Sequence, residues 1–109
     1  MDFSMTSKLS ENSESWLIDI VGEVDIFNSA EVKTKLIELI DEKPLDIRIE
    51  CEKLAYIDST GLGALIAVLK KTKEHEKVIY FQNLKPNLVK LFKITNLDKV
   101  FVIEGDVNE

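Results

Sequence analysis

The chain has 109 residues, of which 45% are apolar and 31% are charged, as is typical of one globular domain with a modest core. Its net charge of -6 disfavours a nucleic-acid partner, because phosphate binding requires clustered cations. A single Cys51 excludes an internal disulfide, and the N-terminus lacks the pattern of a secretory signal. The longest apolar run, residues 61–69, is far shorter than the ~20 residues of a membrane helix. We therefore expect a cytoplasmic protein without a membrane partner.

The hydrophobic periodicity predicts alternating strands and helices along the chain. The expected strands are residues 3–9, 16–21, 46–51, 78–81 and 100–103. The expected helices begin at Asn28, Ser59 and Pro86, and the second runs to about His75. This order implies an α/β fold with a mixed β-sheet of about four to five strands and helices packed on it. We expect one domain over residues 1–109, with a core of about 3–105 and a polar tail at 104–109.

Local signals place the ends of several elements. Gly22 is expected to end the second strand. Asn28 is a plausible N-cap, with Glu31 three residues later to complete a capping box. Pro86 suits the first position of the third helix, and Asn96 can supply the left-handed turn after it.

The most informative stretch is Asp58-Ser59-Thr60-Gly61, which follows a hydrophobic segment and opens the longest apolar run. A hydroxyl where a helix begins lies among unpaired backbone N–H groups, so it suits either an N-cap or a phosphate. The residues alone favour Ser59 as a plain cap, because capping is common and the motif is short.

The helix that follows has two contrasting sides. Its expected buried stripe consists of Leu62, Leu65, Ile66 and Leu69. Another side is unusually small, with Gly61, Gly63, Ala64 and Ala67. Two glycines in the first turns of a helix each cost ~0.5–1 kcal/mol relative to alanine. That cost indicates close backbone approach, either to the sheet or to something outside the domain.

Catalysis by Ser59 lacks a base, which a serine nucleophile requires. The only histidine is His75, and a rise of ~1.5 Å per residue places it ~24 Å from Ser59 on the same helix. We therefore expect no catalytic residue and no enzyme. His75 itself is expected at a solvated helix end.

Metal or nucleotide binding is also weakly supported. One Cys and one His cannot make a structural zinc site. Asp25, Asp58 and a hydroxyl could hold magnesium weakly, although a turn acid and a helix-flanking acid are the simpler interpretation. Gly61-Leu62-Gly63 lacks the third glycine of a dinucleotide fingerprint and the lysine of a P-loop. We expect no cofactor and no metal.

The stretch from Asp58 to Gly63, preceded by Tyr56-Ile57, resembles the signature of STAS-domain anti-sigma-factor antagonists. These are small regulators of bacterial sporulation and general-stress sigma factors. Gly22-Glu23-Val24-Asp25 resembles the Gly-Glu-Leu-Asp turn of that family, and Ser29-Ala30-Glu31 stands at the start of its first helix. Residues 91–97 resemble its third helix and following turn. The resemblance covers about residues 3–105 and implies a single STAS-type domain.

The resemblance implies a partner-switching protein that is monomeric when free. In that family, an anti-sigma factor with serine kinase activity phosphorylates the serine that corresponds to Ser59. The unphosphorylated antagonist binds the anti-sigma factor and releases the sigma factor, phosphorylation switches binding off, and a metal-dependent serine phosphatase resets the switch. Thr60 is a candidate secondary acceptor. The expected phosphosite environment and partner-binding residues are Asp25, Asp58, Thr60, Gly61, Leu62, Gly63 and Ala64.

Two alternatives stay open at this point. One alternative to the antagonist is a STAS module of another signalling assembly, such as a stressosome-like scaffold. The other is a small nucleotide-binding protein that uses Ser59 and the acids. The second ranks lower, because no lysine-bearing phosphate loop is present.

Overall fold

A computed structural model describes residues 2–105, in which six strands form one mixed sheet with three α-helices. The strands are β1 (Ser4–Leu9), β2 (Ser15–Val24), β3 (Asp46–Glu50), β4 (Leu54–Ile57), β5 (Ile79–Gln82) and β6 (Val102–Glu104). The helices are α1 (Ser29–Glu42), α2 (Ser59–Glu74) and α3 (Pro86–Ile94), followed by the short 3-10 helix η1 (Leu97–Lys99). The expected α/β fold is confirmed.

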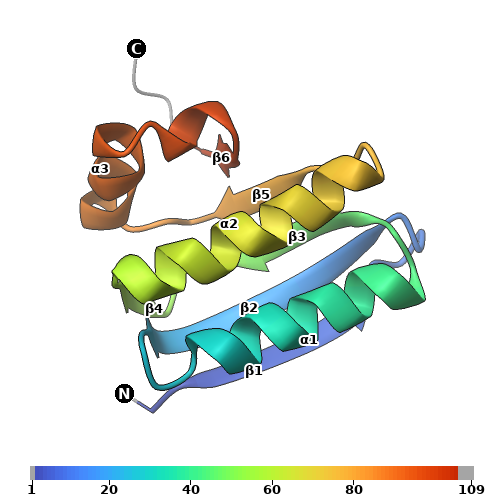
Figure 1. Cartoon of the computed structure of the whole chain (residues 1–109), viewed down its shortest axis with the longest axis horizontal. Coiled ribbons are helices and arrows are strands. Elements are labelled where there is room, and N and C mark those ends of the chain that lie inside the picture. Colours follow the sequence, from blue (N-terminus) through green and yellow to red (C-terminus); the bar gives the residue numbers. More distant parts are fainter. Residues whose placement is uncertain (1, 106–109) are drawn as a thin grey trace.

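The strand order is β1-β2-β3-β5-β6, with β4 paired to β2 away from this path. Among the strands of residues 2–105, β1 alone runs antiparallel to its neighbour, and the other pairs are parallel. Helices α1 and α2 lie side by side on one face of the sheet (Figure 1), and α3 contacts η1, which in turn contacts β6. The carboxyl ends of the parallel strands therefore meet at one edge of the sheet.

The core lies between the sheet and the helices, and the strand periodicity explains it. On β2, Trp16, Ile18 and Ile20 are buried as expected, and Ile47, Ile49 and Cys51 continue this layer along and just past β3. At the α3 end, Phe81 packs edge-to-face with Phe92 at 5.0 Å and with Phe101 at 5.2 Å between ring centroids. These rings fasten α3 and the segment before β6 to the sheet.

The β4 strand is the element that raises the sheet to six strands. Its burial does not alternate, because Leu54 and Ile57 are buried while the two residues between them are exposed. A period of two is therefore not visible in its four residues. Its partner is the end of β2, where Gly22 lies opposite Leu54.

The prediction that Gly22 ends the second strand is wrong. Strand β2 continues to Val24, and Gly22 adopts a φ of 96° at a register shift between Gly22 and Glu23. Glycine tolerates this left-handed backbone, so the residue makes a bulge instead of a terminus.

The predicted capping box at α1 is also wrong. Asn28 occupies the N-cap position, but its side chain makes no cap hydrogen bond. Its Oδ1 accepts from the Asp25 N–H at 2.9 Å, and its Nδ2 donates to the Glu23 carbonyl at 2.8 Å. The side chain thus closes the preceding turn, which offers it two backbone partners at once.

The buried face of α2 is slightly rotated about the helix axis from the face that the periodicity predicts. Leu65 and Leu69 are buried as expected, whereas Leu62 and Ile66 are only partly buried. The buried face of α2 is completed by Gly61, Ala64, Val68 and Thr72. Pro86 begins α3, and Asn96 adopts the expected left-handed conformation with a φ of 62°.

Candidate functional site: the turn after β2 and the start of α2

The site forms where β2 and β4 end side by side. Val24 pairs with Ile57, so the next residues, Asp25 and Asp58, leave the sheet at the same edge. The Asp58 N–H donates to the Val24 carbonyl at 3.1 Å, and the Ile26 backbone N–H helps to lower the pKa of the Asp58 carboxyl. The turn that contains Asp25 therefore lies against the first turn of α2.

Asp58 caps α2, and Ser59 is the first helical residue. Asp58 has extended backbone angles, and its Oδ1 accepts from the Gly61 N–H at 2.8 Å. The sequence-based preference for Ser59 as the cap is therefore wrong: the carboxylate one residue earlier fills the position. No other residue in the described range 2–105 forms a hydrogen bond with the exposed Ser59 hydroxyl.

Thr60 differs from Ser59 in that its hydroxyl is engaged. Its Oγ1 donates to Asp58 Oδ1 at 2.6 Å. This bond, followed by that from Gly61, lowers the pKa of the Asp58 carboxyl below its ordinary value. Asp58 is thus ionised at neutral pH and holds the Thr60 hydroxyl, while the neighbouring Ser59 is an exposed residue.

The Asp25 turn is closed by its own hydrogen bonds. The Asp25 carboxylate accepts from the Phe27 N–H at 2.9 Å, and the Asp25 carbonyl accepts from the Asn28 and Ser29 N–H groups at 3.1 and 2.8 Å. These bonds hold Ile26 and Phe27 at the tip, where they are 67% and 93% exposed.

Neither Ile26 nor Phe27 was among the residues expected at the site. In the sequence, the signal for an exposed apolar surface is the pair of large apolar side chains in succession, outside any element with a regular apolar period. Their exposure beside Ser59 makes an apolar surface that is unusual for a free-standing loop.

The two glycines of α2 have different surroundings. A Cβ on Gly61 would lie 2.7 Å from the Val24 carbonyl oxygen and 2.8 Å from Ile57 Cγ2, so this residue allows close packing on the sheet. A Cβ on Gly63 would meet no atom within 4 Å. Gly61 and Ala64 are buried and Leu62 is partly buried, which leaves Gly63 as the small residue that faces outward.

A shallow hollow runs over Gly63 between the starts of α1 and α2. It measures about 220 Å³ and is lined by Ser29, Ala30, Lys33, Thr60, Gly63, Ala64 and Ala67. Most of these side chains are small, so the backbone of the two helices is accessible there. The structure thus gathers Asp25, Asp58, Ser59, Thr60 and this hollow on one edge of the molecule.

The same geometry separates Ser59 from His75, which is the exposed C-cap residue at the opposite end of α2. No group of three or more His, Cys, Asp or Glu side chains within residues 2–105 could hold a metal ion. None of the helices in that range is long and apolar enough to cross a membrane.

Comparison with known proteins identifies the family. The profile of the STAS domain matches residues 7–109. The chain belongs to the STAS domain family. Within this family, the chain is 32% identical over 105 residues to the anti-sigma-B factor antagonist of Bacillus subtilis (strain 168). The matched region covers 96% of this chain and 94% of that protein. This places the STAS chain among the anti-sigma factor antagonists, which are regulators and not enzymes.

Solved structures of STAS proteins share the fold. A putative anti-sigma factor antagonist from Thermotoga maritima superposes with a TM-score of 0.82 at 18% identity, over 91% of this chain and 84% of that one. The Bacillus cell fate determinant SpoIIAA in its phosphorylated form superposes with a TM-score of 0.72, also at 18% identity, over 94% and 93%.

Proposed function

We propose that this STAS protein binds an anti-sigma factor through the edge formed by the Asp25 turn and the start of α2, and that phosphorylation of Ser59 switches the binding off. Binding would release the sigma factor. The anti-sigma factor would itself be the serine kinase, a metal-dependent phosphatase would reverse the modification, and the exchange would occur in the cytoplasm with the free protein as a monomer.

The observation that carries the proposal is the state of the two neighbouring hydroxyls. Ser59 is exposed and its hydroxyl makes no hydrogen bond with residues 2–105, so a kinase can reach this hydroxyl without breaking native contacts. The Thr60 hydroxyl donates to a carboxylate at 2.6 Å, and that bond must break before Thr60 can act as an acceptor. Ser59 is therefore the principal site.

Modification should leave the fold intact. A phosphate adds about -1.5 to -2 charges, and the start of a helix favours an anion by ~0.3–1 kcal/mol at an exposed position. The ionised Asp58 opposes it, but the phosphate remains solvated. No hydrogen bond of α2 is lost, because Asp58 and not Ser59 caps the helix.

The complex should not tolerate the phosphate. Ile26 and Phe27 offer apolar contact area at the tip of the Asp25 turn, and the hollow over Gly63, lined in part by Thr60, allows close approach. A phosphate on Ser59 that is buried in this interface would be removed from water without a partner, which costs several kcal/mol. Since about 1.4 kcal/mol is tenfold in affinity, binding is lost without any change of conformation.

The test uses purified anti-sigma factor and ATP. Ser59→Ala should bind the anti-sigma factor and resist phosphorylation, Ser59→Asp should bind poorly, and Thr60→Val should bind and still be phosphorylated at residue 59 by mass spectrometry. Equal capture of the anti-sigma factor by Ser59→Ala and Ser59→Asp would contradict the interface, and phosphate on Thr60 of the wild type alone would contradict the acceptor.

A further inference from the structure

The side chain of Asn28 makes bonds that a helix cap does not require. It stands at the N-cap position of α1, yet both of its hydrogen bonds go back to the preceding turn. Its Oδ1 accepts from the Asp25 N–H at 2.9 Å, and its Nδ2 donates to the Glu23 carbonyl at 2.8 Å. A carboxamide carries an acceptor beside its donors, so one partly buried side chain satisfies both backbone groups.

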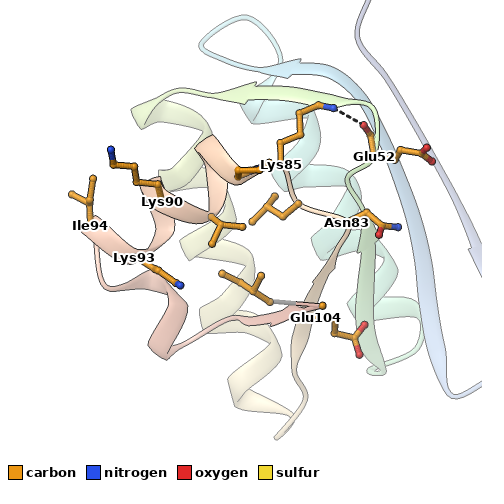
Figure 2. A pocket seen from close by; sticks show the side chains of 12 residues that line it. Glu52, Asn83, Lys85, Lys90, Lys93, Ile94 and Glu104 are labelled. Atoms are coloured by element: carbon orange, nitrogen blue, oxygen red, sulfur yellow. Dashed lines mark hydrogen bonds between the residues drawn. The ribbon is translucent and has the colours of Figure 1, made fainter. Parts of the chain in front are cut away.

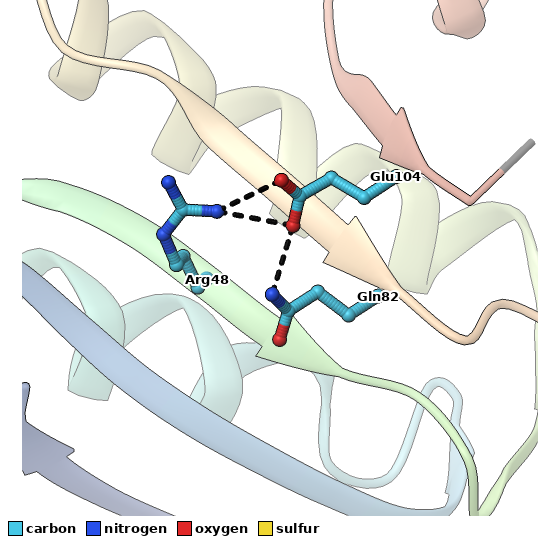
Figure 3. Close-up of polar contacts among 3 residues, drawn as sticks. All are labelled: Arg48, Gln82 and Glu104. Carbon is cyan, nitrogen blue, oxygen red and sulfur yellow. Dashed lines mark hydrogen bonds and ion pairs between the residues drawn. The ribbon is translucent and has the colours of Figure 1, made fainter.

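Two other side-chain amides, at and just after the carboxyl end of β5, bond to carboxylates instead. Asn83, beside the groove along α3 (Figure 2), donates to the two carboxylate oxygens of Glu50 at 3.1 and 2.9 Å. Gln82 donates to Glu104 Oε1 at 2.8 Å (Figure 3). These bonds join neighbouring strands, whereas the two bonds of Asn28 close a single turn.

The turn that Asn28 closes carries the exposed side chains of Ile26 and Phe27 at its tip. Apolar side chains in water lower their free energy by collapsing onto neighbouring surface, so an open tip needs a restraint. Asn28 fixes the Asp25 N–H, and the Asp25 carboxylate in turn accepts from the Phe27 N–H at 2.9 Å. The backbone of the tip is therefore held by a chain of bonds that begins at Asn28.

We propose that Asn28 is the positioning residue of the partner surface: by holding the Asp25 turn, it keeps Ile26 and Phe27 in the conformation that the anti-sigma factor binds. This inference rests on the proposed function and requires no contact between Asn28 and the partner. A surface that is ordered before binding loses less conformational entropy in the complex. Without the carboxamide, the competent turn is one of several conformations, and the apparent affinity falls with its population.

The variant Asn28→Asp separates positioning from helix capping. Aspartate has nearly the same shape and is among the best N-caps, so α1 can begin as before. Its carboxylate can still accept from the Asp25 N–H but cannot donate to the Glu23 carbonyl. Asn28→Ser is the neutral counterpart, because serine also suits the N-cap and removes the carboxamide without adding charge.

The matched control is Asn83→Gly. It removes the bonds to Glu50 at another strand end, and glycine accepts the φ of 57° at this position. In the free protein, the heteronuclear NOE of the Ile26 and Phe27 amides should fall in both Asn28 variants and keep its wild-type value in the control. The melting temperatures of the Asn28 variants should stay within a few degrees of wild type, since both new residues can cap α1.

Calorimetric titration with the purified anti-sigma factor measures the effect on binding. Both Asn28 variants should bind about tenfold more weakly than wild type, and Asn83→Gly should bind normally. Adding Asn28→Ser to Phe27→Ser should weaken binding little further, because Asn28 acts through the tip that Phe27→Ser already removes. Losses that multiply in the double variant would mean that Asn28 itself contacts the partner, which contradicts the positioning role.

Two further results would overturn the inference. One is wild-type affinity in both Asn28 variants, and the other is weak binding of both with an unchanged NOE at the tip. Failure of the proposed function looks different, because Ser59→Ala and Ser59→Asp, which keep Asn28, would then bind the anti-sigma factor equally.

Discussion

The two glycines at the start of α2 predict opposite effects of the same substitution. Both lie in the first turns of one helix, and in an isolated helix each change to alanine would stabilise by ~0.5–1 kcal/mol. Their surroundings differ, because the added methyl at position 61 meets the sheet and the one at position 63 meets solvent.

The magnitude follows from the distances. The methyl of Gly61→Ala would lie 2.7 Å from the Val24 carbonyl oxygen and 2.9 Å from Val24 Cγ1, so the start of α2 must move. Such overpacking costs ~1–3 kcal/mol, which exceeds the helical gain. We expect a net loss of ~0.5–2 kcal/mol and a fall in melting temperature of about 2–10 °C. Gly63→Ala should raise the melting temperature by about 2–5 °C.

Urea and thermal denaturation of both variants, followed by circular dichroism, measures these differences. An unchanged urea m-value would show that the denatured state is not responsible. A stability of Gly61→Ala equal to or above that of Gly63→Ala would refute the close packing of α2 on β2 and β4.

Three further predictions concern single side chains. Phe27→Ser should change the free energy of unfolding by less than ~0.5 kcal/mol, because the ring is 93% exposed. The same variant should weaken anti-sigma factor binding about tenfold in a calorimetric titration. The control is Ile94→Ser, at an exposed position on α3, which should bind the anti-sigma factor normally. Asp58→Ala should melt a few degrees lower at neutral pH. Because the folded pKa of Asp58 is depressed, its contribution to folding stability is present above the ordinary pKa of 3.8 and is lost as the pH falls through the folded pKa. The difference in melting temperature between Asp58→Ala and wild type should therefore narrow in acid. A difference in melting temperature that is constant with pH would contradict this. Burial, with a smaller effect of Glu50, raises the pKa of Cys51 to about 12. A thiol reagent should therefore label Cys51 only when urea is added. Rapid labelling of the native protein would be inconsistent with a buried thiol.

The fold could be predicted from the sequence because most elements repeat their apolar residues at a clear period. The alternation of Ile47, Ile49 and Cys51 identifies β3 and its buried face. The Leu54–Ile57 segment has only four residues and two adjacent exposed positions, so its periodicity does not reveal a strand. Gly22 signals a break in the ladder, but a bulge and a strand end share that signal.

The cap of α2 lies one residue before the position that the sequence favoured, and this and the other local errors have physical causes. Ser59 and Asp58 are both good caps, and the choice between them depends on a helix boundary that sequence does not fix so finely. Asn28 has the composition of a cap, but the Asp25 turn supplies competing backbone partners. Ile26 and Phe27 were missed because periodicity identifies apolar residues that are buried, whereas these are exposed.

The bulge at Gly22 separates two parts of β2 that pair with different strands. Ser15 to Asp19 pair with β3 in the main sheet, whereas Gly22 to Val24 pair with β4, which carries Asp58 and Ser59 at its end. The edge that we propose binds the partner is therefore a short branch joined to the sheet through three residues of one strand. Small displacements there, when a partner arrives or a phosphate is added, need not be transmitted to the pairing of β2, β3 and β5. A branched sheet thus permits a surface that changes its chemistry repeatedly while the core keeps a single packing.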